Sequence, residues 1–527
     1  MDQRALAMKL GRWLPGVVVL VLAAPLLAAW LPGGSRVHLD AAGPVAAGEG
    51  AQIRWSPLAA SLGVAAAAAS LAVCVGGWLA WLLGASDLPG RRVWASLLIV
   101  PFVCPGTVWA MAQAYCYGEG GMADRWLGGI WPLRWEVSAQ GRYAACALVL
   151  AQVLVPVPML LGMEGVRRLS GGASWAARFI PGRARRLAWY VGAIRLELGA
   201  AWLLCLALAL GNFAIPHVLQ CRLYTIEVYL RQTNYLDAVG AARLAVLLVA
   251  PALAAAAWLA WLERRREYAT AEPLAAGPAL MLGRARWWAL AGVAAYVLLV
   301  MGLPIGALVA ECRSGALFLA AVRDAVPETE TSLWIAALAA AAACGLSVAA
   351  VHGGSRLGLV AASVLLAVPP LVVGVAYARF FNRLWPVDRG LLTASAAPLV
   401  LALALRGWPF AVRLLAAARA RLAPEWHHAA QLAGWRGWQR TMLMGPLWAG
   451  PAFTGAMVTY MLALGEVEIT QALAVPGSGT LALRLFTFLH FGPTHVAASL
   501  ALLLLLLAVI PMAALSLATG RILSPIQ

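Results

Sequence analysis

The stretch RGWPFAVRLLAAARARLAPEWHHAAQLAGWRGWQRTMLMGPLWAGP, residues Arg406–Pro451, separates two long apolar segments. It carries several arginines and one carboxylate, Glu425, and is too polar to remain inside a lipid bilayer. On both sides the chain returns to apolar runs that are long enough to cross about 30 Å of hydrocarbon as helices. This alternation predicts a chain that crosses a membrane several times.

The composition supports the same conclusion. Of all residues, 63% are hydrophobic and 12% are charged, whereas soluble domains contain about 25% charged residues. The period-two alternation that is typical of membrane barrel strands is absent from the sequence. Because backbone groups in lipid must be paired internally, only helices and closed barrels can span a membrane. We therefore predict an all-α polytopic membrane protein.

The net charge of +17 comes from arginines that cluster in short loops between apolar runs. This is the pattern of cytoplasmic loops, so the basic balance indicates topology and contacts with anionic lipid rather than a nucleic-acid partner. The single lysine, Lys9, is followed by Leu10, and a Walker A loop requires Gly-Lys-Ser/Thr. We therefore expect no P-loop ATPase site in this chain. As a separate expectation, we assign it no catalytic residues and no directly bound cofactor.

Twelve spanning helices are predicted, with both termini in the cytoplasm. The first follows three basic residues and is longer than the core of a typical signal peptide, about 7–15 residues, so we expect it to be retained. The predicted spans are 13–32, 56–84, 93–113, 142–163, 194–216, 238–262, 287–310, 331–351, 357–378, 391–410, 449–468 and 493–518.

The two halves of the chain look like repeats with a period near 254 residues, the separation of Gly211 and Gly465. Both halves begin and end on the same side, which predicts two parallel six-helix repeats around an axis along the membrane normal. The first repeat covers 1–263, a cytoplasmic linker 264–286, and the second repeat 287–527. Transport of a solute along a path between the repeats is the favoured function. The alternative is a structural scaffold that arose by gene duplication and has no transport function. The matched features are Gly211-Asn212 with Gly465-Glu466, Thr225 with Thr480, Ala176-Ala177 with Ala429-Ala430, and Pro101/Pro105 with Pro369/Pro370.

The centre of the opening stretch has the features of a short cytoplasmic helix. Pro424 and Glu425 suit a first helical turn, because proline has no N–H to leave unpaired and a carboxylate is favoured at the positive end of the helix dipole. Ala429 and Ala430 allow another surface to approach the backbone, and Gly434 permits a turn. Such a helix is suited to receive force from a partner. The alternative is an amphipathic helix held at the lipid surface by its tryptophans.

The segment PEWHHAAQLAG, followed by Pro446 and Pro451, resembles the EAA loop of binding-protein-dependent ABC importer permeases. The fused two-repeat permeases of ferric-iron and thiamine type are the most similar, and the resemblance covers nearly the whole chain. In that family the loop reads roughly P-E-x-E-E-A-A-x-x-x-G and docks into a cleft of a cytoplasmic ATPase. The matching positions are Pro424, Glu425, Ala429, Ala430 and Gly434.

The chain departs from this pattern at two places. His428 stands where the family has an acid before Ala-Ala, which leaves one carboxylate in the loop. The first-half segment SWAARFIPG is a weaker match, with Trp175 in place of the acid. Its candidate coupling residues are Ala176, Ala177 and Gly182. The resemblance thus implies that the second half carries most of the coupling.

The resemblance also implies the partners of the chain. A cytoplasmic ABC ATPase dimer would hydrolyse ATP, and a periplasmic solute-binding protein would deliver the solute to a permease in the bacterial cytoplasmic (inner) membrane. Ferric iron is the favoured solute, with thiamine or an organic phosphonate as alternatives. An ion-coupled secondary transporter would need buried ionisable residues near mid-membrane, and a membrane enzyme would need an acidic or histidine cluster. Neither pattern stands out in the sequence.

Polar residues within or beside apolar runs are candidates for the translocation pathway, because burying them in a membrane is costly. Asn212, Glu466, Glu468 and Thr470 lie at the predicted outer ends of 194–216 and 449–468. We favour the interpretation that these four residues line the pathway. The alternative is that they lie just beyond the hydrocarbon and are hydrated. Arg406 is expected to extend to the inner surface.

No metal site is predicted. The side chains of His427 and His428 diverge by about 100° on a helix and cannot chelate one ion. His490 and His495 flank an outer turn, where a structural role is favoured over contact with a metal cargo. The eight cysteines are scattered without a CxxC pair, and a disulfide among the outer-side residues Cys116, Cys221 and Cys312 stays open.

Overall fold

The computed structural model describes most of the chain from residue 55 to residue 523. The described ranges are 55–126, 139–167, 179–233, 235, 281–352, 356–381, 395–420, 425, 432–434 and 438–523 without 476 and 478, together with 240, 241, 244, 245, 247–251, 253, 254, 257, 258 and 261. Within these ranges the chain forms helices and connecting turns and no extended β-strand. The predicted all-α fold class is confirmed. The predicted span 13–32 and residues 264–280 of the linker 264–286 lie outside the described residues.

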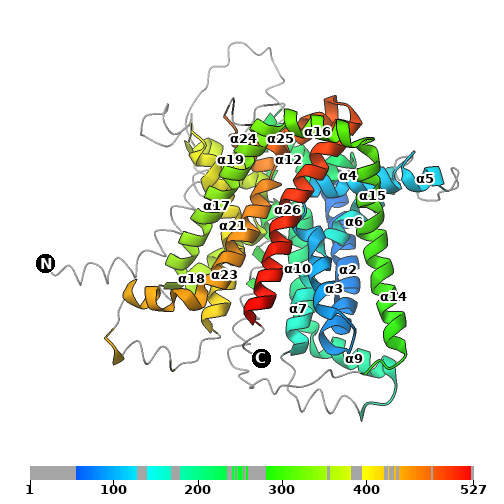
Figure 1. The fold of residues 1–527 in the computed structure, drawn as a ribbon, viewed down its shortest axis with the longest axis vertical. Coiled ribbons are helices and arrows are strands. Elements are labelled where there is room, and N and C mark those ends of the chain that lie inside the picture. Colours follow the sequence, from blue (N-terminus) through cyan, green and yellow to red (C-terminus); the bar gives the residue numbers. More distant parts are fainter. Residues whose placement is uncertain are drawn as a thin grey trace.

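Ten helices in the first half and twelve helical segments in the second are described (Figure 1). The first-half helices are α2 (Trp55–Ala85), α3 (Arg91–Val103), α4 (Gly106–Tyr117), α5 (Met122–Trp126), α6 (Ala139–Leu154), α7 (Pro156–Arg167), α9 (Arg183–Ala193), α10 (Arg195–Leu210), α11 (Ala214–Val218) and α12 (Tyr224–Thr233). The second half contains α14 (Ala285–Val297), the π-helical turn η2 (Leu298–Gly302), α15 (Leu303–Glu311), α16 (Gly315–Asp324), α17 (Val326–His352), α18 (Arg356–Ala367), α19 (Pro370–Arg379), α21 (Ala397–Ala420), α23 (Trp438–Leu464), α24 (Glu468–Leu473), α25 (Leu481–Phe491) and α26 (Thr494–Leu523).

Six of the described helices are long and apolar enough to cross a membrane, or up to eight spans result if each of two bent helix pairs crosses once. The protein is therefore a multi-pass membrane protein. The count of twelve stays a prediction, since the span 13–32 is outside the described residues and 238–262 is described only in part.

Several predicted spans are broken rather than continuous. The span 93–113 divides into α3 and α4, which meet at an angle of 101° around Pro105. The span 357–378 divides at Pro369, and in both cases the proline lacks the N–H that would continue the helix. The spans 194–216 and 449–468 end at Gly211 and Gly465 and continue as the short helices α11 and α24. These breaks correct the prediction of unbroken helices and bring polar backbone groups into the protein interior.

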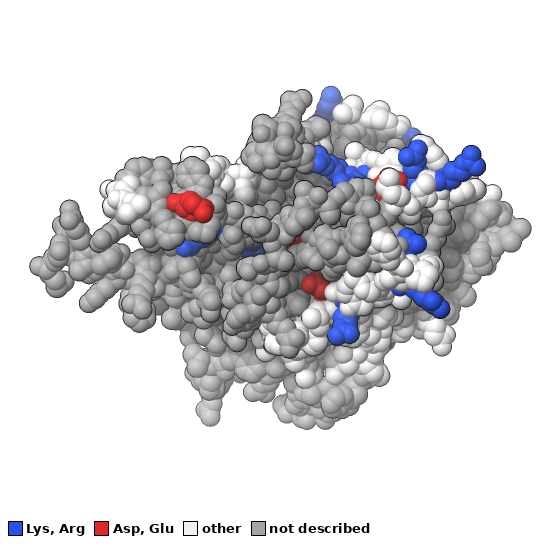
Figure 2. Space-filling model, turned by 90° about the horizontal axis from the view of Figure 1, so that it is seen from below, with Lys and Arg blue, Asp and Glu red and all other residues white. Residues whose placement is uncertain are grey.

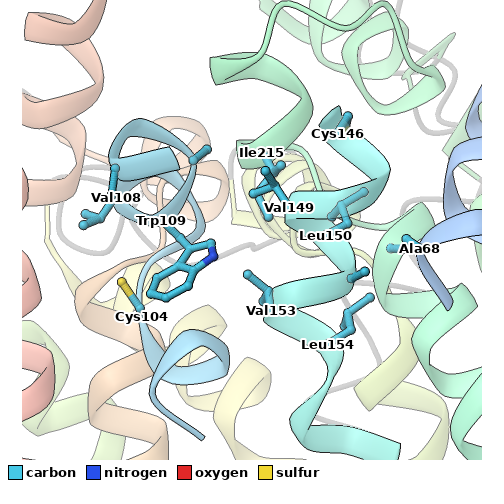
Figure 3. Packing of buried hydrophobic residues seen from close by; sticks show 14 of the residues in the cluster. Ala68, Cys104, Val108, Trp109, Cys146, Val149, Leu150, Val153, Leu154 and Ile215 are labelled. Carbon is cyan, nitrogen blue, oxygen red and sulfur yellow. The ribbon is translucent and has the colours of Figure 1, made fainter. Parts of the chain in front are cut away.

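Each half has its own helix bundle. In the first half, α2 packs against α6, α7 and α10, whereas in the second half α17, α21 and α23 pack against one another. Trp109 of α4 is buried against α6 (Figure 3). Its indole nitrogen donates a hydrogen bond to Gln152 Oε1 at 3.2 Å. α15 and α26 of the second half also contact α4, so the two halves are joined by extensive helix packing.

Glycines allow the closest contact in the second bundle. A Cβ atom at Gly407 of α21 would lie 2.1 Å from Thr459 Cγ2 of α23, and a Cβ at Gly455 of α23 would lie 2.7 Å from the Ala411 Cα. Small residues let helix backbones approach in this way where lipid tails surround the bundle.

One end of the molecule carries several exposed arginines among the described residues. α9, the start of α14 and the end of α26 lie at one end, here named the basic end, whereas α12, α16, α24 and α25 lie at the other, the α25 end (Figure 1). A view of the basic end shows arginine side chains at several places and only isolated Asp and Glu side chains among the described residues (Figure 2). Exposed arginines of this end include Arg91, Arg92, Arg185, Arg284 and Arg286.

Candidate functional site: a cavity between the two halves

A cavity of about 140 Å³ lies where the four helix breaks meet. Its lining comes from both halves: the α3–α4 and α10–α11 breaks on one side, and the α18–α19 and α23–α24 breaks on the other. The walls are mostly apolar. The polar side chains that line it are Asn212, Arg406, Glu466 and Glu468.

The breaks are held together by two reciprocal contacts between glycine and proline. A Cβ atom at Gly465 would lie 2.6 Å from Pro105 Cγ, and a Cβ atom at Gly211 would lie 3.3 Å from Pro369 Cγ. Each half thus provides a glycine that the proline of the other half covers. The absence of a side chain at both glycines permits the close approach that closes the cavity.

Glu468 joins the two halves through its carboxylate. Oε1 accepts a hydrogen bond from the Phe213 N–H at 3.3 Å, and Oε2 accepts one from the Leu371 N–H at 3.0 Å. Phe213 precedes α11 and Leu371 lies in the first turn of α19, where backbone N–H groups have no partner within the helix. The side chain is 6% exposed. A buried carboxylate therefore pairs with one otherwise orphaned donor in each half.

The neighbouring polar residues cap the short helices after the breaks. Asn212 Oδ1 accepts the Ile215 N–H at 3.0 Å, and the Glu466 carboxylate accepts the N–H of Ile469. Asn212 and Glu466 thus perform the same capping role in the two halves. Thr470, the fourth predicted pathway residue, does not line the cavity. Its hydroxyl donates to the Glu466 backbone oxygen at 2.6 Å, so it closes the helical turn.

Arg406 was expected at the inner surface, and this prediction is wrong. It lies in the cavity wall, close enough to attract the carboxylates of Glu466 and Glu468. Its Nη1 also donates to the Leu366 carbonyl at 3.4 Å. The attraction of the buried carboxylates, together with the carbonyl acceptor, explains why a guanidinium is retained among apolar helices.

The cavity is bordered toward the α25 end by an aromatic cluster in which both halves take part. Phe213 contacts Tyr229 and His217, with ring centroids 4.5 and 4.8 Å apart. The hydroxyl of Tyr229 accepts a hydrogen bond from Gln471 Nε2 at 2.6 Å. His217 faces His490 of α25 with 2.9 Å between their Nε2 atoms. Burial and the neighbouring His490 lower the pKa of His217 to about 4, so His217 is neutral near neutral pH.

The predicted coupling segments are described only in part. Gly434 and Gly182 are described and have φ angles of 71° and 87°, in the left-handed region that favours glycine. Glu425 is exposed. Leu432, two residues before Gly434, is 89% exposed, and Phe179, three residues before Gly182, is 69% exposed. Four predicted coupling residues lie outside the described residues: Ala176, Ala177, Ala429 and Ala430.

Comparisons with known proteins add no family. No protein-family model matches the chain, and no curated protein matches it.

Among the described residues, no group of three or more His, Cys, Asp and Glu side chains is placed to hold a metal ion. The thiols of Cys116, Cys221 and Cys312, for which a disulfide was left open, are buried and free.

The two glycine–proline contacts differ in the space that they leave for a side chain, which is smaller at Gly465 than at Gly211. Gly465→Ala is expected to lower the free energy of unfolding by about 1–3 kcal/mol, because the rigid Pro105 ring cannot rotate away from the added methyl group. Gly211→Ala, with 3.3 Å to Pro369, is the matched variant and should cost less than about 1 kcal/mol. Denaturant unfolding of the purified protein in detergent measures both, and equal losses would contradict the described clearance.

Proposed function

We propose that this chain is the membrane-spanning permease subunit of a binding-protein-dependent ABC importer. The observation that carries the proposal is the cavity between the two halves, where buried ionisable groups meet helix breaks. In membrane proteins, buried ionisable groups and broken helices are features of solute pathways. Asn212, Glu466 and Glu468 line this path, and Arg406 belongs to it.

The two halves act as parallel repeats that move against each other. The reciprocal contacts of Gly211 with Pro369 and Gly465 with Pro105 support this arrangement, since the glycines are separated by the repeat period found in the sequence. Twelve spans in two groups of six complete the architecture. The basic end faces the cytoplasm, in keeping with the distribution of arginine, and the α25 end faces the periplasm.

Two separate protein partners complete the importer. A cytoplasmic ATPase dimer contacts the segments 424–434 and 174–182, and the exposed Leu432 and Phe179 offer apolar surface beside them. A periplasmic solute-binding protein docks at the α25 end and delivers the solute. Ferric iron remains the favoured solute, because two carboxylates at the cavity suit a cation, with thiamine or a phosphonate as alternatives.

The coupling test uses Gly434. Gly434→Trp should reduce ATP-dependent uptake of radiolabelled ferric iron to background, since the bulky residue strains a left-handed position and blocks the docking surface. Joint replacement of Ala429 and Ala430 by leucine should have the same effect. The assay uses proteoliposomes with the ATPase and binding protein, and size-exclusion chromatography verifies folding.

Gly182→Trp is the matched control, because it changes the equivalent position of the weaker first-half segment. It is expected to retain most of the uptake. Full uptake by a folded Gly434→Trp protein would rule out coupling through this segment. The assay is repeated with labelled thiamine, so that a wrong solute is distinguished from a wrong coupling site.

A second candidate function is an ion-coupled secondary transporter. It is favoured by the buried cluster of Arg406, Glu466 and Glu468, which is the kind of group that carries coupling ions through a membrane. Proteoliposomes that contain the chain alone discriminate the two mechanisms. Uptake that is driven by an imposed proton or sodium gradient and abolished by an ionophore would favour the secondary transporter over the importer.

A further inference from the structure

The contact between α11 and α25 places two imidazole rings from opposite halves against each other. His217 Nε2 and His490 Nε2 are 2.9 Å apart. The sequence indicates no such pair, because the two residues are 273 positions apart along the chain. The fold brings His490 to His217 instead.

Both rings are fixed in orientation by their surroundings. His490 Nδ1 lies 2.9 Å from the Phe486 carbonyl oxygen, which can only accept a hydrogen bond, so Nδ1 carries a proton. The His217 ring stacks on Phe213 and Phe486, with centroid distances of 4.8 and 4.9 Å. Histidines that bind metals commonly donate their second ring N–H to a backbone carbonyl, which directs the other nitrogen toward the metal.

The helix that carries His490 is itself anchored. Arg484 of α25 donates to Glu328 Oε1 at 2.6 Å and also pairs with Asp324, and both carboxylates belong to the α16–α17 region. The Thr480 side chain caps α25 by accepting the Leu483 N–H at 3.3 Å. A site on α25 therefore needs little rearrangement before it binds a ligand.

We propose that His217 and His490 bind one transition-metal ion that joins the two halves at the α25 end. With metal–nitrogen bonds of about 2.05 Å, two nitrogens 2.9 Å apart subtend an angle of about 90° at the metal. This angle fits two adjacent positions of the tetragonal geometry that Cu²⁺ and Ni²⁺ adopt, whereas tetrahedral Zn²⁺ requires a wider separation. His490 is exposed, so water can fill the remaining positions.

The protons of the pair are accounted for when the metal binds. In the metal-free pair, the bond between the two Nε2 atoms requires a proton on one of them, and the Nδ1 proton of His490 assigns it to His217. Metal binding places that proton on His217 Nδ1 and frees Nε2 as a ligand. The site does not rest on the transport proposal, since metal binding is measured directly.

The test is a Cu²⁺ titration of the purified full-length chain, without a histidine tag, in detergent. Isothermal titration calorimetry in the presence of glycine as a weak competitor should give one Cu²⁺ per chain, with Ni²⁺ and then Zn²⁺ binding more weakly. Electron paramagnetic resonance should show coupling to two imidazole nitrogens. Because second-shell changes alone cost about 10–100-fold in metal affinity, His217→Ala and His490→Ala should each cost more than tenfold.

His495→Ala is the matched control, because this histidine lies on the same end of the molecule in the first turn of α26. His495→Ala should leave the Cu²⁺ affinity and the electron paramagnetic resonance spectrum unchanged. His490→Gln keeps a polar side chain at the exposed position. It therefore controls for a loss of Cu²⁺ affinity that is caused by misfolding of the variant. Unchanged Cu²⁺ affinity in a folded His217→Ala or His490→Gln protein, or an equal loss in His495→Ala, would overturn the proposed site.

Discussion

Glu468→Ala is expected to lower the free energy of unfolding by about 3–5 kcal/mol, the usual result of removing one partner from a buried charged pair. The variant leaves the N–H groups of Phe213 and Leu371 without an acceptor inside the protein. It also takes one of two carboxylates away from Arg406. Each buried donor without a partner costs about 1–3 kcal/mol, so the expected total does not depend on a single contact.

Glu468→Gln provides the control for this prediction. Glutamine has the same length and keeps one carbonyl oxygen, so it can accept one of the two N–H bonds but cannot attract Arg406 as a carboxylate does. An intermediate loss is therefore expected. Denaturant unfolding in detergent, followed by tryptophan fluorescence, measures all three proteins. If Glu468→Ala matches the wild type, the carboxylate does not hold the halves together.

Gly407→Ala is expected to have the second large effect. It should lower the free energy of unfolding by about 3 kcal/mol, the upper part of the range for overpacking. The added Cβ would meet three atoms of Thr459, at 2.1 Å from Cγ2, 2.5 Å from Oγ1 and 2.6 Å from Cβ. Rotation of the Thr459 side chain cannot relieve the contact with its Cβ. The helices α21 and α23 must therefore separate, although they form the tightest contact of the second-half bundle.

A double-mutant cycle tests whether this clash is the cause. Thr459→Gly removes the three atoms that lie nearest to the new methyl group, so the double variant should recover most of the stability that Gly407→Ala loses. Gly345→Ala in α17 is the matched control, because a Cβ there has no neighbour within 4 Å. It should be neutral or slightly stabilising, as alanine is the better helix former. Absence of recovery in the double variant would show that another contact is responsible.

The helical class and the approximate positions of the spans could be predicted because they depend on local composition. A run such as 56–84 has no polar group that would stop a helix, and α2 extends over Trp55–Ala85. The sequence also singles out Asn212, Glu466 and Glu468, which line the cavity, because polar residues at the ends of apolar runs are unusual. Their role in a pathway stays a prediction. The sequence alone therefore predicts whether a residue is buried wherever its immediate neighbours along the chain decide its burial.

The helix breaks and the true position of Arg406 could not be predicted, because contacts distant in sequence decide them. Pro101 and Pro105 are both visible in one apolar run, yet Pro101 stays within α3 and the chain turns at Pro105. At Pro105 the chain lies against Gly465 of the other half, a contact that the sequence alone does not reveal. Arg406 follows an apolar run as a surface arginine would, and only the approach of the α23–α24 break provides carboxylates for it. His217 and His490 meet for the same reason.

The single carboxylate clamp between the halves has a consequence for the history of the chain. By the proposed repeat period, Ala214 occupies the position in the first half that Glu468 occupies in the second, and Asn212 that of Glu466. A dimer of two half-length chains that both resembled the second half would place four carboxylates around one cavity of about 140 Å³, and like charges at such distances repel strongly. Under the proposed repeat, fusion into one polypeptide would permit the two copies to diverge, so that one copy supplies the acids and the other receives them.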